Sequence, residues 1–174
     1  MRIRDIKREE IKEVRELDRS EIVEQINYYR NGRLVLEDEY YNITKWNLEE
    51  LEHIIRDLYD LYDRGGNFYG AFKNHKLIGI IALETKFIGS NNDQLQVVFL
   101  HVAHDYRDKG LGSNLMNLVT KRAKNMGAKK LYISATPSKH TVDFYMGLGC
   151  KLASEINPEL FKLEPEDIHL ELLI

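Results

Sequence analysis

One stretch of the chain joins an apolar run to a glycine turn and a helical pattern. Residues 95–103 form the apolar run, residues 107–112 read Arg-Asp-Lys-Gly-Leu-Gly, and apolar residues recur at helical spacing over residues 111–126. Because Gly110 and Gly112 lack a Cβ, the backbone there can approach a ligand closely or take a positive φ. The first amides of a helix have no partner within it, and the helix dipole adds positive charge. The stretch therefore predicts a strand, a turn and a helix whose first amides can hold a phosphate.

Two widespread phosphate-binding motifs do not fit this stretch. The dinucleotide fingerprint needs a third small residue three places after the second glycine, where this chain has Leu115. A Walker loop needs Gly-Lys followed by Ser or Thr after a four-residue gap, and no such segment occurs. Arg107 and Lys109 can add positive charge to the turn. An ordinary tight turn before a helix stays the alternative, so a second signal is needed.

That second signal lies in residues 131–150. They read as a strand, a short loop with Pro137, a helix that carries Phe144 and Tyr145, and a stop at Gly149.

With both segments in view, the chain resembles the GNAT superfamily of N-acetyltransferases over roughly residues 66–152. The family's signature Gln/Arg-x-x-Gly-x-Gly/Ala is matched by Arg107, Gly110 and Gly112. Its later pattern, a Phe-Tyr pair followed by x-x-x-Gly, is matched in the second segment. The resemblance implies a mixed α/β fold, with a mostly antiparallel central sheet flanked by helices and two central strands that splay apart. It also implies transfer of an acetyl group from acetyl-CoA to a primary amine by direct attack, without a metal.

The resemblance further implies how acetyl-CoA is held. The pantetheine arm would lie between the splayed strands, with the Leu100 amide stabilising the oxyanion of the reaction, and the pyrophosphate would meet the amides of residues 107–113. Ser138, where the family often has Asn, would be a polar contact to the arm. The residues expected to contact the cosubstrate are Leu100, His101, Val102, Arg107, Asp108, Lys109, Gly110, Leu111, Gly112, Ser113, Ser138 and Tyr145.

The expected catalytic residues are Tyr145, Glu84 and Gln96. Tyr145 would act as general acid toward the departing thiolate. Some family members place a Glu as general base eleven residues before the signature Gln or Arg, and here that position holds Gln96, which cannot accept a proton at neutral pH and would orient a water instead. Glu84, in an apolar strand, is expected either to face the acceptor with a raised pKa or to be a solvated strand-end group. His101 and His104 also lie near the expected thioester.

Composition fits one cytoplasmic enzyme domain over residues 1–174. Its 43% hydrophobic content can form a sizeable core, and no apolar run approaches a membrane span or a signal core. The single cysteine excludes an internal disulfide and suits a reducing compartment. A net charge of −3 argues against a nucleic-acid partner. Residues 104–151 hold nine Lys or Arg against three Asp or Glu, so the rest of the chain must carry the net negative charge. That acidic remainder suits a small cationic amine.

The amino-terminal third carries the clearest turn signal. Asn31-Gly32 between two aromatic and branched runs predicts a hairpin with a type I′ turn. Its tyrosines and acidic residues suit an acceptor site, whereas a homodimer contact or an ordinary exposed hairpin is the alternative. The remaining expected elements are a strand at 2–7, a helix with Ile11, Val14 and Leu17, hairpin strands at 22–29 and 34–41, a helix capped by Asn47 and ended by Gly65-Gly66, strands at 68–73 and 76–88 joined by Asn74-His75, and strands at 151–154 and Ile168–Leu173.

Three other functions stay open at this point. A peptide or protein acetyltransferase would show an open groove. A non-catalytic acyl-CoA-binding regulatory module would bind without turnover. An unrelated phosphate-binding domain would bind coenzyme A no better than adenosine diphosphate.

Overall fold

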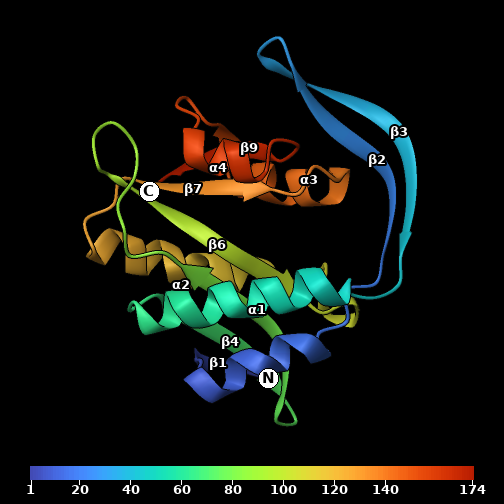
Figure 1. Ribbon diagram of the computed structural model, residues 1–174, viewed down its shortest axis with the longest axis vertical. Coiled ribbons are helices and arrows are strands. Elements are labelled where there is room, and N and C mark those ends of the chain that lie inside the picture. Colours follow the sequence, from blue (N-terminus) through green and yellow to red (C-terminus); the bar gives the residue numbers. More distant parts are fainter.

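A seven-stranded sheet between layers of helices forms the body of the protein, as Figure 1 shows for the computed structural model of residues 1–174. The strand order is β1-β4-β5-β6-β7-β9-β8, and only β6 and β7 run parallel. The predicted mixed and mostly antiparallel sheet is confirmed. The elements are β1 (Arg2–Asp5), the 3₁₀-helix η1 (Arg8–Glu16), β2 (Glu21–Arg30), β3 (Arg33–Ile43), α1 (Leu48–Asp63), β4 (Asn67–Lys73), β5 (Lys76–Leu83), β6 (Gln94–Val102), the 3₁₀-helix η2 (His104–Tyr106), α2 (Leu111–Asn125), β7 (Lys130–Ala135), α3 (Lys139–Gly147), β8 (Lys151–Leu152), α4 (Pro158–Leu163) and β9 (Ile168–Leu173).

Two hydrophobic clusters hold helices on the two faces of the sheet. On one face, α1 and η1 pack their apolar sides against β4 and β5. On the other face, α2 and α3 pack against β5, β6, β7 and β9. Burial of apolar area on both faces supplies most of the stabilisation expected for such a layered domain. None of the helices combines the length and apolarity needed to cross a bilayer.

The predicted turns and caps are confirmed. Asn31 and Gly32 have φ of +52° and +79°, which is the positive pair that a type I′ turn requires. Asn74 and His75 repeat this geometry between β4 and β5. At the start of α1, the Asn47 side chain accepts a hydrogen bond of 3.0 Å from a backbone amide of the first turn.

Three expectations about elements need correction. The segment with Ile11, Val14 and Leu17 is a 3₁₀-helix, and the spacing of three matches its three residues per turn. β5 ends at Leu83 and not at residue 88, because the chain turns at Glu84. A short helix, α4, stands between the last two strands and was not predicted.

The hairpin of β2 and β3 is a separate two-stranded sheet. In Figure 1 it arches along the right edge, from the half of the molecule that holds α1 to the half that holds α3. Its strand β2 docks on the loop before α3, where the Asn27 amide donates to the Pro137 carbonyl at 2.8 Å and Ile26 forms a bridge with Ser138. The hairpin therefore makes a second connection between the two halves, in addition to the pairing of β6 with β7 in the main sheet.

Candidate active site

The two parallel strands separate part of the way along their length. β6 and β7 pair only from Gln94 with Lys130 to Val97 with Ile133. At this point β6 has a β-bulge with Val98 as the extra residue, because Val97 pairs with Leu83 while the next pair joins Phe99 to Ala82. A bulge bends a strand and increases its twist, so β6 turns away from β7. We call the space between residues 98–102, residues 134–138 and the first half of β2 the β6–β7 opening.

The register of β6 decides which backbone groups face this opening. The Ala103 amide donates to the Ile78 carbonyl of the neighbouring chain segment at 3.0 Å. Because hydrogen-bonded pairs alternate along an antiparallel ladder, the backbone of His101 faces β5, whereas Leu100 and Val102 direct theirs into the opening. The expected cosubstrate contact through the His101 backbone therefore needs correction, whereas contacts through the backbone of Leu100 and Val102 stay a prediction.

The glycine turn presents a row of amides that have no partner within the chain. The N–H groups of residues 108–113 donate no hydrogen bond in the structure, whereas that of Arg107 donates to His104 and that of Asn114 to Gly110. Asp108 and Gly110 have φ of +56° and +78°, which turns successive amides toward the same side. Six consecutive donors at a helix start form a site suited to a pyrophosphate.

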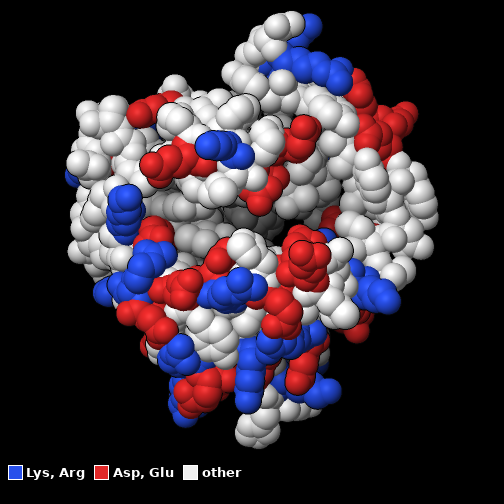
Figure 2. All heavy atoms as spheres, in the orientation of Figure 1, with Lys and Arg blue, Asp and Glu red and all other residues white.

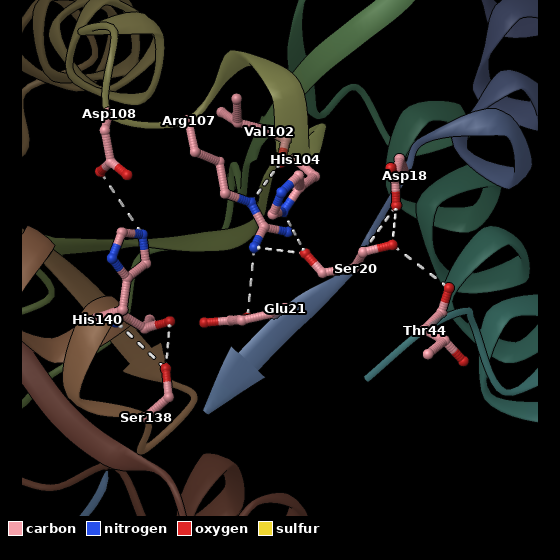
Figure 3. A network of polar contacts seen from close by, with 11 residues as sticks. Asp18, Ser20, Glu21, Thr44, Val102, His104, Arg107, Asp108, Ser138 and His140 are labelled. Atoms are coloured by element: carbon pink, nitrogen blue, oxygen red, sulfur yellow. Dashed lines mark hydrogen bonds and ion pairs between the residues drawn. The ribbon is translucent and has the colours of Figure 1, made fainter. Parts of the chain in front are cut away.

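The basic side chains of this turn serve the protein itself. Arg107 donates from Nε to the Val102 carbonyl at 3.0 Å and from a terminal nitrogen to the Ser20 carbonyl at 3.3 Å, and it lies 3.5 Å from the Glu21 carboxylate (Figure 3). Lys109 donates to a backbone carbonyl of η2. The Arg107 guanidinium thus ties the end of β6 to the start of β2, and it does not point to a phosphate as its charge suggested.

Ser138 stabilises the start of α3. Its hydroxyl accepts from the Thr141 amide at 3.3 Å and donates to the Thr141 hydroxyl at 3.0 Å, so it caps α3. The side chain is 3% exposed. Across the opening, His140 of α3 lies 4.0 Å from Asp108 (Figure 3), so the glycine turn and the start of α3 approach each other closely.

Tyr145 is buried in the core with a hydroxyl that is free to donate. Its ring belongs to the core beneath α3, in edge contact with Phe144, while its hydroxyl makes no hydrogen bond within the chain. Burial raises the pKa of Tyr145, and the nearby Cys150 and Asp167 charges act in the same direction. The phenol therefore stays protonated at neutral pH and can supply a proton to a departing thiolate.

Glu84 does not face the opening, so the expectation of a raised pKa is wrong. Its carboxylate binds the Arg64 guanidinium through two hydrogen bonds of 2.9 and 3.1 Å. Burial alone would raise its pKa, but the hydrogen bonds from Arg64 and from the amides of Thr85 and Lys86 lower the pKa below its usual value. Glu84 is an ion-pair partner of α1 and not an available base.

Gln96 lies on the paired part of β6, before the opening begins. Its backbone carbonyl accepts from the Glu84 amide, and its partner on β7 is Tyr132. The half-buried side chain makes no hydrogen bond within the chain, and its role in orienting a water stays a prediction.

The two histidines near the opening differ in environment. The His101 ring packs against Trp46 and Phe99 at centroid distances of 4.9 and 6.3 Å, and its Nε2 is buried without a partner. Burial, followed by the Arg107 charge, lowers the pKa of His101 to about 4, so the ring is neutral at pH 7. His104 is exposed, with Nδ1 2.8 Å from the Ser20 carbonyl.

Two of the four hairpin tyrosines line a cavity. Tyr28 and Tyr29 line a cavity of about 160 Å³ together with Phe161 of α4 and Asp167, whereas Tyr40 and Tyr41 are exposed and do not line it. Figure 2 shows a hollow near the middle of this face of the molecule, with Asp and Glu side chains among those around it.

Sequence reasoning missed Ser134 and Asp167, which border the opening from β7 and from the turn before β9. The Ser134 hydroxyl donates to Asp167 Oδ2 at 2.9 Å. No local motif marks either residue, because their proximity depends on the pairing of β7 with β9.

Comparisons with known proteins agree with this geometry. The sequence model of the acetyltransferase (GNAT) family matches residues 26–149. Among solved structures, nourseothricin acetyltransferase superposes with a TM-score of 0.74 at 18% identity over 99% of this chain and 97% of that one. A streptothricin acetyltransferase of Bacillus anthracis str. Ames, bound to acetyl coenzyme A, gives 0.71 at 18% identity over 99% and 98%. The PaiA N-acetyltransferase of Thermoplasma acidophilum, bound to coenzyme A, gives 0.65 at 19% identity over 99% and 98%.

Comparison with curated protein sequences gave no significant match. The family match covers more than two thirds of the chain and includes the glycine turn, the β6 and β7 sides of the opening and Tyr145. The protein therefore belongs to the GNAT acetyltransferase family and is an acetyl-CoA-dependent acyltransferase.

Proposed function

We propose that the protein transfers the acetyl group of acetyl-CoA to a primary amine of a small cationic molecule by direct attack. The observation that carries this proposal is the β6–β7 opening, which has six unpartnered amides at one end and the Tyr145 hydroxyl in the adjoining helix. It offers phosphate binding, backbone donors for an extended arm and an acid for the leaving group in one continuous region.

Each part of the opening has a distinct task in this proposal. The amides of residues 108–113 bind the pyrophosphate, and the backbone of Leu100 and Val102 holds the pantetheine arm. The Leu100 amide is directed at the developing oxyanion, a contact that typically contributes 10²- to 10³-fold to the rate. Tyr145 gives its proton to the thiolate as the carbon–sulfur bond breaks.

The hairpin supports a small acceptor over a protein tail. Its docking on the loop before α3 closes the outer edge of the opening, where an extended peptide would need an open groove. Carboxylates around the hollow and the aromatic rings that line the cavity between β2 and α4 suit a cation. The superposed nourseothricin and streptothricin acetyltransferases make those antibiotics reasonable first probes, although an identity of 18% shows only a shared fold.

Calorimetry and a thiol-release assay test the proposal. Acetyl-CoA is titrated into the protein first, with adenosine diphosphate as competitor. Thiol release is then followed with nourseothricin, spermidine, lysine and a short lysine peptide. Saturable turnover of a small amine supports the proposal, and preferential turnover of the peptide contradicts the acceptor class. Binding without turnover of any amine would favour the regulatory module, and displacement by adenosine diphosphate as effective as by coenzyme A would favour an unrelated phosphate-binding domain.

A further inference from the structure

The acceptor amine needs a group that takes its proton, and the groups expected for this task are not available. Glu84 is held by Arg64 away from the opening. The Nε2 atom of His101 is buried, in a ring that packs against Trp46 and Phe99. Gln96 cannot accept a proton at neutral pH. An amine is mostly protonated at neutral pH, so some other side chain or water must fill this role.

Asp167 lies beside the inner end of the opening. Its Oδ2 accepts from Ser134, and Ser134 is the first residue of β7 beyond the last pair with β6, so it marks the inner end of the opening. Oδ1 has no hydrogen-bond partner within the chain. Asp167 also lines the cavity between β2 and α4. One oxygen is thus held in place while the other is free, at the point where cavity and opening meet.

The two faces of the sheet separate Asp167 from the expected acid. Ser134 pairs directly with His169, and directly opposite residues of an antiparallel pair share a face. That face is covered by α4, because the Phe161 ring lies 5.6 Å from the His169 ring. Tyr145 belongs to the cluster on the other face. An amine entering on the α4 side would meet Asp167 first, while the thiolate leaves toward Tyr145.

The charges around Asp167 suit a proton acceptor. Burial raises the pKa of Asp167, while the Ser134 hydrogen bond and the His169 charge act to lower it. A raised pKa brings a carboxylate closer to the pKa of a useful base at neutral pH. The other titratable groups that face it are Glu164 and Glu166 in the same turn and Tyr28 across the cavity, and its charge also reaches Tyr145 on the other face of the sheet.

We infer that Asp167 is the general base of the transfer and the anchor of the acceptor ammonium group, with Ser134 as the positioning residue that holds its carboxylate at the inner end of the opening. The inference rests on the proposed function and names the residue that makes an ammonium ion reactive there.

The protons balance in this scheme. One proton of the ammonium group passes to Asp167 and from there to solvent. The neutral nitrogen attacks the thioester carbonyl, the carbon–nitrogen bond forms and the carbon–sulfur bond breaks with its electron pair leaving on sulfur. The second proton, lost from nitrogen as the amide forms, replaces the one that Tyr145 gives to the thiolate. The products are the acetylated amine, coenzyme A and one proton.

The test compares wild type with Asp167→Asn, Ser134→Ala and Glu159→Gln. Asn keeps an oxygen for the Ser134 hydrogen bond but cannot accept a proton. Glu159 is an exposed carboxylate on α4 and serves as the matched charge control. For each variant, kcat/KM for nourseothricin and for spermidine is measured from pH 6 to 10, together with acetyl-CoA affinity by calorimetry and the thermal midpoint.

We expect Asp167→Asn to lower kcat/KM at pH 7 by about 100-fold or more, the usual range for a lost base, with acetyl-CoA affinity unchanged. The deficit should shrink toward pH 10, because the free amine then forms without help. Ser134→Ala should shift the acidic limb of the profile to higher pH, since the hydroxyl stabilises the ionised carboxylate. Glu159→Gln should match wild type.

Two results would overturn the inference with the proposed function intact: full activity of Asp167→Asn at pH 7, or a deficit that stays constant across the pH range and so reflects structure or charge alone. Absence of thiol release by the wild type with every panel amine would instead remove the proposed function, and this inference with it.

Discussion

Gly112→Ala tests how closely α2 approaches α3 at the phosphate-binding turn. A Cβ at residue 112 would lie 3.0 Å from Cζ and 3.1 Å from Cε2 of Phe144, below the 3.4 Å at which ordinary contact begins. The ring must therefore move by about 0.4 Å. Overpacking of this kind costs roughly 1–3 kcal/mol, and the higher helix propensity of Ala returns at most about 1 kcal/mol. We expect a net loss of about 1 kcal/mol in the free energy of unfolding.

Gly110→Ala is the matched control, because the same substitution there has a different cost. A Cβ at residue 110 would meet nothing within 4 Å, but φ is +78°, and an L-residue in this conformation costs roughly 1–2 kcal/mol. Phe144→Leu replaces the ring that the new Cβ of Gly112→Ala would contact too closely. It should relieve that variant by at least about 0.5 kcal/mol in a double-mutant cycle and leave Gly110→Ala unrelieved.

Urea unfolding of the five variants and wild type measures these couplings, and acetyl-CoA calorimetry follows the turn itself. If Gly112→Ala is as stable as wild type, or if Phe144→Leu couples equally to both glycine positions, the contact with Phe144 is not what requires a glycine at residue 112.

Three further predictions concern titratable side chains. Tyr145→Phe should lower kcat about ten-fold or more, the scale of lost acid catalysis. Acetyl-CoA affinity and the thermal midpoint should stay near wild type, because the hydroxyl makes no hydrogen bond within the chain. An unchanged kcat would remove Tyr145 from the mechanism. Glu84→Gln should lower stability at pH 7 by about 0.5–1 kcal/mol without changing turnover. Because Arg64 lowers the pKa of Glu84, the stability difference between wild type and variant, measured by urea unfolding, should fade as pH falls through that lowered pKa. His101→Phe should reduce the acid sensitivity of unfolding. The wild-type ring has a pKa of about 4 when folded and 6.5 in the reference state, so the unfolded chain binds the extra proton and about 3 kcal/mol of stability is lost between pH 6.5 and 4. Equal losses in the wild type and the variant would contradict this.

The features that sequence predicted well depend on neighbours in the chain. The type I′ turn at Asn31-Gly32, the cap at Asn47 and the free amides after Arg107 follow from local backbone chemistry, which a few residues determine. The order of the two signature segments then indicated the fold.

The features that sequence missed depend on tertiary contacts. Glu84 has an apolar strand before it, but only the position of Arg64 at the end of α1 decides where its carboxylate points. The bulge at Val98 appears only when β6 is paired with β5. Asp167 lies in an unremarkable turn, and its proximity to Ser134 follows from a strand pairing across 33 residues.

The docking of β2 near α3 has a consequence for the order in which the protein folds. Asn27 and Pro137 are 110 residues apart in sequence, and closing so long a segment is slow because its entropy is lost before the contact forms. The phosphate-binding turn needs only adjacent elements, β6 and α2. During refolding, acetyl-CoA binding should therefore return before amine turnover, and chains caught between these steps would hold the cosubstrate without a closed acceptor site.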